Sequence, residues 1–145
     1  MAQKDLTSRL RPLSADELKR MEAEADRALQ ELAADYLSVT GAQLEELQRS
    51  FANPTWQDVA WSTQVYRTAH EIKGQGSTFG FTLISEIGAS LCRLIRQREK
   101  LPEADFDRRA AAHCAAIRAV LEKGIKGDGG SEGAALLDLL GPPLE

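Results

Sequence analysis

Residues that hold metal ions or form disulfides are scarce in this chain, since its 145 residues include only two cysteines and two histidines. Cys92 and Cys114 lie far apart in the sequence, and neither has a cysteine or histidine at the spacing of a metal site or a redox pair. We therefore expect no metal site and two buried free thiols, as is usual in a reducing compartment.

Long apolar runs and an excess of basic residues are also absent. No run approaches the roughly 20 residues that span a bilayer, and the N-terminal MAQKDLTSRLRPL lacks the apolar stretch of a signal peptide. The formal net charge of −4 argues against general nucleic-acid binding and gives no reason to expect an anionic membrane as a partner. We expect a cytoplasmic protein without nucleic-acid or membrane partners.

Strand-like alternation is missing too, whereas apolar residues recur at helical spacing through most of the chain. Short loops between helices favour antiparallel neighbours. The sequence therefore predicts an all-α fold, an antiparallel up-and-down four-helix bundle with an additional N-terminal helical piece and a short C-terminal helix. The predicted organisation is a tail (1–13), the bundle (14–124), and a Gly-rich turn with a short helix that packs on the bundle (125–145).

The first helix is predicted behind a capping box of Ser14 and Glu17, with an interruption at Thr40-Gly41. Its apolar series contains Leu18, Met21, Ala25, Leu29, Leu32 and Tyr36. The later helices are expected from about Trp56, after Asn53-Pro54, into a Gly-rich segment; from Gly80 to near Leu101-Pro102; from Asp105 to Lys123, ended by Gly124; and from Ala134 to Leu140.

The segment around His70 (residues 69–80) is the most informative part of the sequence. At 100° per residue, Val65, Ala69, Ile72, Gly76 and Phe79 form one apolar stripe, the predicted core face. His70 lies about 140° from the centre of that stripe, so we expect it to face solvent. Its neighbours on that face are Thr63, Tyr66, Arg67, Lys73, Gly74 and Ser77.

Two glycines follow this histidine within a predicted helix. Each costs about 1 kcal/mol relative to alanine there, and local stability does not explain that cost. Gly74 and Gly76 therefore indicate close approach by another chain. Lys73, one turn after His70, can neutralise an oxyanion attached to the imidazole.

The pattern His70-x-x-Lys73-Gly74, followed by Gly80, resembles the histidine-phosphotransfer (HPt) domain. Ala69, Ile72 and Phe79 match the family at positions around the motif, and Gly76 departs from it, since members more often carry Ser or Ala there. The following helix also looks like the third helix of such domains. Its matching residues are Ser85, Gly88, Ser90 and Leu91.

The resemblance implies a four-helix bundle that shuttles a phosphoryl group between aspartates of receiver domains. His70 would be the phosphorylated nucleophile, Lys73 would pair with the transferring oxygens, and Gly74 would give the receiver's loops room. The candidate partner-binding residues are Thr63, Tyr66, Arg67, Ser77 and Gly80. The receiver would supply Mg²⁺ and an acidic pocket, so we expect no cofactor on this chain, which we take to be mostly monomeric.

Two other functions remain open. His70-Glu71-Ile72-Lys73 also fits the first half of the dimerisation-helix motif of sensor histidine kinases, but Gly74-Gln75-Gly76 stands where Thr-Pro-Leu is expected, and no ATP-binding region follows. A helical adaptor that binds a receiver or kinase without phosphotransfer would use the same surface. We favour a transfer intermediate that does not use ATP.

The remaining histidine and the basic end of the third helix have simpler interpretations. His113 has Ala116, not a lysine, three residues later, which favours a partly buried structural histidine. The basic residues of the helix end favour a solvated surface that complements the helix dipole, with receiver contact as a secondary role. These are Arg93, Arg96, Arg98 and Lys100.

Overall fold

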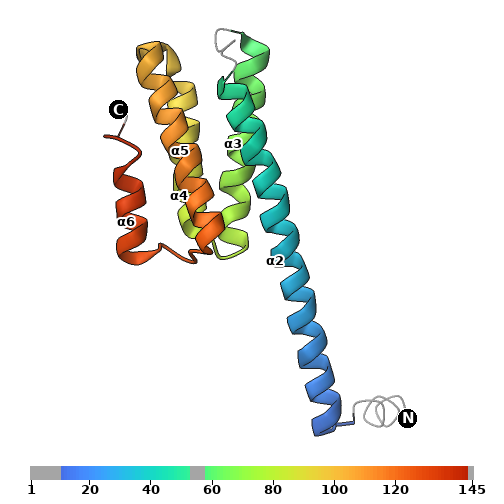
Figure 1. Ribbon diagram of the computed structural model, residues 1–145. Coiled ribbons are helices and arrows are strands. Elements are labelled where there is room, and N and C mark those ends of the chain that lie inside the picture. Colours follow the sequence, from blue (N-terminus) through green and yellow to red (C-terminus); the bar gives the residue numbers. More distant parts are fainter. Residues whose placement is uncertain (1–10, 53–57, 144–145) are drawn as a thin grey trace, which may run out of the picture. The chain divides into compact units, whose positions relative to one another are not determined.

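The computed structural model describes residues 11–52 and 58–143, and the regular structure in these ranges is all helical (Figure 1), which confirms the predicted all-α class. The elements are α2 (Ala15–Ala52), α3 (Val59–Thr78), α4 (Thr82–Arg96), the 3-10 turn η1 (Arg98–Lys100), α5 (Glu103–Lys123) and α6 (Gly130–Asp138). Within the described ranges, none of these helices is both long and apolar enough to cross a bilayer.

Several helix ends are formed by the residues that the sequence indicates. The Ser14 hydroxyl accepts from the backbone N–H of Glu17 at 3.2 Å, and the Glu17 carboxylate accepts from the N–H of Ser14 at 3.4 Å, which confirms the capping box. Gly124 ends α5 in the left-handed conformation at φ +63°, as predicted. Asp58, which was not predicted as a cap, caps α3 by accepting from the Ala60 N–H at 2.9 Å.

Three predicted boundaries are wrong. α2 continues through Thr40-Gly41 because Thr40 is fully buried and the packing on both sides outweighs the modest cost of one helical glycine. α4 ends at Arg96, since the chain tightens into η1 before Pro102. α6 starts at Gly130, four residues early, where the Asp128 carboxylate accepts from the Gly130 N–H. The expected start of a helix at Asn53-Pro54 and Trp56 lies outside the described residues.

The chain divides into two compact units, residues 1–35 and 36–145. In the first, the described residues 11–35 contain a single helical segment, so within these residues its apolar stripe has no second element to pack on. Its large apolar side chains are 45–64% exposed. They are Leu18, Met21, Leu29 and Leu32.

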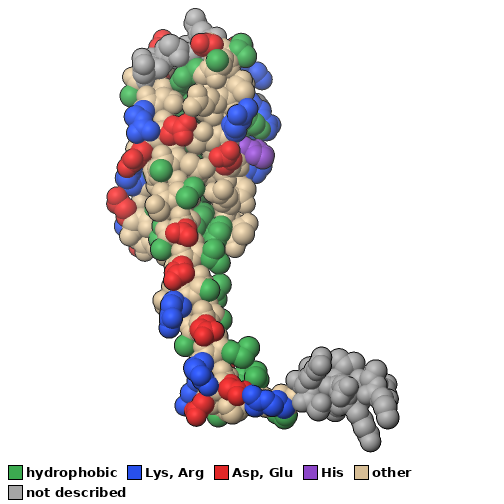
Figure 2. Space-filling view, turned by 90° about the vertical axis from the view of Figure 1, so that its right-hand side faces the viewer, with side chains coloured by type: hydrophobic (Ala, Val, Ile, Leu, Met, Phe, Trp, Pro, Cys, Tyr) green, Lys and Arg blue, Asp and Glu red, His purple; other side chains and the backbone are tan. Residues whose placement is uncertain are grey.

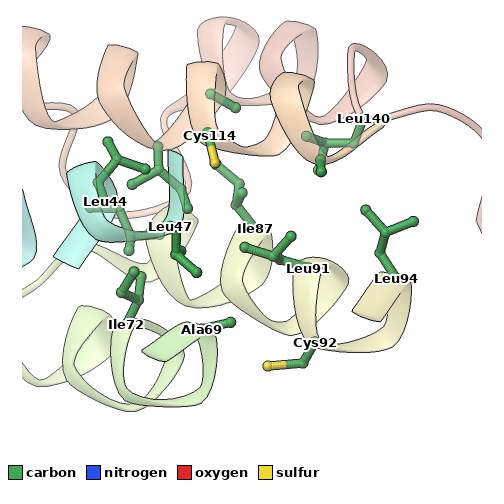
Figure 3. Close-up of a cluster of buried hydrophobic side chains, with 14 of the residues drawn as sticks. Leu44, Leu47, Ala69, Ile72, Ile87, Leu91, Cys92, Leu94, Cys114 and Leu140 are labelled. Carbon is green, nitrogen blue, oxygen red and sulfur yellow. The ribbon is translucent and has the colours of Figure 1, made fainter. Parts of the chain in front are cut away.

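In the second unit, α3, α4, α5 and the C-terminal part of α2 lie side by side and share one core (Figures 1 and 3). Figure 3 shows side chains from all four helices meeting there, among them Leu44, Ile72, Leu91 and Cys114. Hydrogen bonds tie α2 to α3 and α5 around this core. They join Gln43 to Glu71, Gln64 to Glu46, Trp61 to Ser50 and Arg118 to Gln48.

The smaller features of this unit complete the core. Leu136 and Leu137 pack against it from α6, and Leu140 is buried. Cys92 and Cys114 are free and buried, as predicted. Burial raises the pKa of Cys114 to about 12, which keeps its thiol protonated and poorly nucleophilic.

Candidate functional site

His70 lies on the outer face of α3, where the core fixes the helix from behind. Val65, Ala69 and Ile72 are at most 1% exposed, whereas His70 is exposed. This confirms the orientation that the helical spacing predicts. Figure 2 shows a histidine side chain at the surface with Lys and Arg side chains nearby, whereas His113 is only 2% exposed.

The residues expected around His70 share its face. Lys73 and Gly74 lie one helical turn after it, and Thr63 and Arg67 lie before it; all four are exposed. Tyr66 is half-buried, and its ring stacks on the imidazole with 6.1 Å between centroids and 30° between planes. An exposed imidazole thus stands between two cations and against one aromatic ring.

Arg96 of α4 joins this face, although its place in the sequence predicts only a secondary role in partner contact. Its guanidinium carbon lies 5.1 Å from the Tyr66 ring centroid, and its Nη2 donates to the Tyr66 hydroxyl. A surface hollow of about 410 Å³ lies beside the pair; its lining also includes Thr63 and Arg98. Helical spacing within α3 cannot reveal a contact from the next helix, so the sequence carries no direct signal for Arg96.

The two glycines after His70 differ in their surroundings. A Cβ on Gly74 would meet nothing within 4 Å, so close approach by another chain remains a prediction there. A Cβ on Gly76 would lie 2.6 Å from Ser85 Oγ and 2.8 Å from the Phe81 carbonyl oxygen. The inference that Gly76 admits another chain is therefore wrong, because the neighbour that requires a glycine is α4 of the same chain.

Ser77 and Gly80 are engaged in the turn between α3 and α4. The Ser77 hydroxyl donates to Ser85 Oγ at 2.9 Å. Gly80 has φ +84°, which favours glycine, and its carbonyl accepts from Gly127 N–H at 2.9 Å. These bonds give both residues a local structural role, and partner binding by either remains a prediction.

His113 is a buried structural histidine, more buried than the sequence suggests. Its Nε2 lies 2.8 Å from Ser90 Oγ and its Nδ1 lies 2.6 Å from the Arg109 carbonyl oxygen. The carbonyl can only accept, so Nδ1 carries the proton and the Ser90 hydroxyl donates to Nε2. Burial lowers the pKa of His113, which favours this neutral form. With both nitrogens bonded, this imidazole is not available as a surface nucleophile.

Of the two histidines, His70 is the one that is exposed to an outside partner. A neutral imidazole nitrogen is a nucleophile near pH 7, and the cations beside His70 favour a developing or attached negative charge. A family model described as Hpt domain matches residues 15–126. Searches among curated proteins and among solved structures gave no match.

Proposed function

The chain belongs to the Hpt domain family, since the matched residues 15–126 span most of it, and from this premise we propose that it carries a phosphoryl group on His70 between aspartates of receiver domains. The family supports a phosphorelay role in general. The observation that carries the assignment to His70 is its exposure on α3 beside Lys73 and Arg67, while His113 is buried and bonded at both nitrogens.

The proposed step is an in-line displacement at phosphorus. The unprotonated ring nitrogen of His70 attacks the aspartyl phosphate of the receiver, and an N–P bond forms as the P–O bond to the aspartate breaks. The bonding pair leaves with the carboxylate, while the other imidazole nitrogen keeps its proton. Transfer to a second receiver is the reverse reaction, so the chain acts as an intermediate and consumes no ATP.

Each neighbour of His70 has a proposed part in this step. The Lys73 ammonium pairs with the phosphoryl oxygens, where a charge-assisted hydrogen bond is strongest. Gly74, which has open space where a side chain would be, lets the receiver's loops approach. Arg67 faces the acidic pocket of the receiver, and Tyr66 supplies an aromatic contact for docking. Thr63, Ser77 and Gly80 are further candidates for partner contacts.

We also propose that the protein works in the cytoplasm as a monomer, with receiver domains of response regulators or hybrid kinases as partners. The alternative is an adaptor that docks on a receiver by the same face and transfers nothing. A sensor-kinase role is disfavoured by Gly74-Gln75-Gly76 in the motif after His70.

A phosphotransfer assay tests the proposal. Receiver domains from the source organism are labelled on aspartate with radioactive acetyl phosphate and Mg²⁺, purified, and mixed with this chain. Label is expected on the chain, stable in base and labile in acid; it should disappear in His70→Gln and persist in His113→Gln. Label that remains on the His70 variant contradicts the assignment. Binding without transfer by every receiver tested supports the adaptor.

A further inference from the structure

A hydroxyl from α4 bridges two backbone groups of α3 directly after His70. Ser85 Oγ donates to the Lys73 carbonyl oxygen at 2.7 Å and accepts from the Ser77 backbone N–H at 2.8 Å. In a regular α-helix the carbonyl of one residue and the N–H four residues later form a pair. Ser85 therefore bridges one such pair, at the turn that begins with Lys73.

The bridge uses the full hydrogen-bonding capacity of the serine. A hydroxyl has one proton to donate and two lone pairs to accept. Ser85 donates to Lys73 and accepts from both the N–H and the hydroxyl of Ser77, the latter at 2.9 Å. Because its donor position and both acceptor positions are used, the Ser85 hydroxyl has little freedom to rotate. It therefore fixes the backbone groups that it joins.

Two glycines allow α4 to come this close. A Cβ on Gly76 of α3 would lie 2.6 Å from Ser85 Oγ and 2.9 Å from the Ser85 nitrogen. A Cβ on Gly88 of α4, one turn after Ser85, would lie 2.9 Å from the Lys73 Cα and 3.0 Å from its Cβ and nitrogen. The backbone of Lys73 thus rests on Gly88 and is hydrogen-bonded by Ser85, while its side chain extends from the exposed face.

We infer that Ser85 and Gly88 are positioning residues for phosphotransfer, which hold the Lys73 backbone so that its ammonium meets the phosphoryl group on His70. This inference rests on the proposed function. A flexible four-carbon side chain reaches a defined point only if its Cα is fixed, and small displacements of a catalytic group lower rates steeply. Tyr66 and Arg96 are held by their own contact with each other, whereas Ser77, another candidate for partner contact, is bonded to Ser85.

Ser85→Ala tests the inference by removing the bridge with almost no change in volume. The maximal rate of transfer from phosphorylated receiver is expected to fall about tenfold, with little change in the receiver concentration that gives half of that rate. Ser85→Cys, which keeps the size but bonds weakly, is expected to behave in the same way. Ser90→Ala is the matched control, because it removes a bonded hydroxyl from the same helix on the His113 side.

A double-mutant cycle separates positioning from general structural damage. In a Lys73→Gln background there is no ammonium to position, so Ser85→Ala is expected to cause no further loss. An equal fold-change in both backgrounds, or a wild-type rate for Ser85→Ala and Ser85→Cys, overturns the inference. Helix content and unfolding midpoints are measured for every variant, and only variants that are folded at the assay temperature are compared. If the wild-type chain accepts no phosphoryl group at all, the proposed function itself is wrong.

Discussion

The Tyr66 side chain on α3 is held by Arg96 of α4 in two ways at once. The guanidinium carbon lies 5.1 Å from the ring centroid, and the guanidinium donates to the hydroxyl. The same ring stacks on the imidazole of His70 at 6.1 Å. Tyr66 is thus fixed by Arg96 and also contacts His70, the candidate nucleophile. Through this ring, α4 is coupled to the site on α3.

Arg96→Ala is expected to weaken docking of a phosphorylated receiver. Loss of the cation frees the Tyr66 ring and removes a positive charge from a face that we propose meets an acidic pocket. The half-saturating receiver concentration should rise about three- to tenfold at low salt, with a smaller effect at high salt because exposed charges are screened. The readout is the rate of transfer against receiver concentration at two ionic strengths.

Arg108→Ala is the control for this prediction. Arg108 is an exposed arginine of α5 whose guanidinium pairs with Asp105 at 2.6 Å, so the variant removes the same charge away from α3. Equal responses of the two variants would show that net charge, and not the Tyr66 contact, controls docking.

Gly76→Ala and Gly74→Ala are expected to have opposite effects on stability. A Cβ at Gly76 would lie within 3 Å of the Phe81 carbonyl oxygen and the Ser85 nitrogen, so α3 and α4 must move apart. This should lower the free energy of unfolding by about 1–3 kcal/mol. A Cβ at Gly74 meets nothing, so the variant should gain about 0.5–1 kcal/mol from the better helix former. Urea unfolding followed by circular dichroism measures both.

The Gly74 variant also tests the site. If Gly74 leaves room for a receiver, Gly74→Ala should transfer phosphate more slowly although it is more stable, a combination typical of functional glycines. Wild-type transfer by a stabilised Gly74→Ala would show that the space above Gly74 is not used.

The sequence predicted the helices and the orientation of His70 because both follow from periodicity within one segment. Apolar spacing in α3 separates the buried Ala69 and Ile72 from the exposed His70 without reference to any other helix. The capping box at Ser14 and the left-handed Gly124 are local in the same sense.

What the sequence did not predict depends on contacts between helices. Gly74 and Gly76 look alike in sequence, but only Gly76 faces α4. Arg96 looks like a solvated helix end until its distance to Tyr66 is known. The bridge from Ser85 to Lys73 joins residues twelve positions apart, and no spacing rule within one helix connects them.

Two leucines of α2 should respond very differently to truncation. Leu44 is 0% exposed in the shared core, so Leu44→Ala should cost about 2–5 kcal/mol of unfolding free energy. Leu29 is 64% exposed, so Leu29→Ala should change it by less than about 0.5 kcal/mol. Comparable losses, measured in urea, would mean that Leu29 is covered in solution.

Acid should destabilise the fold through His113. Burial, helped by the charges of Arg109 and Arg93, lowers the pKa of this histidine in the folded chain below the ordinary 6.5. At pH values between the pKa of His113 in the folded chain and its pKa in the unfolded chain, the unfolded chain binds more protons than the folded chain. The free energy of unfolding therefore falls as the pH drops below about 6.5. His113→Gln can keep the bond with Ser90 but cannot titrate, and it should lose this part of the pH dependence. The carboxylates contribute equally to the pH dependence of the wild type and of His113→Gln. The difference between the two curves of unfolding free energy from pH 7.5 to pH 5 therefore isolates the contribution of His113. Parallel curves would mean that the imidazole accepts a proton in place without opening the core.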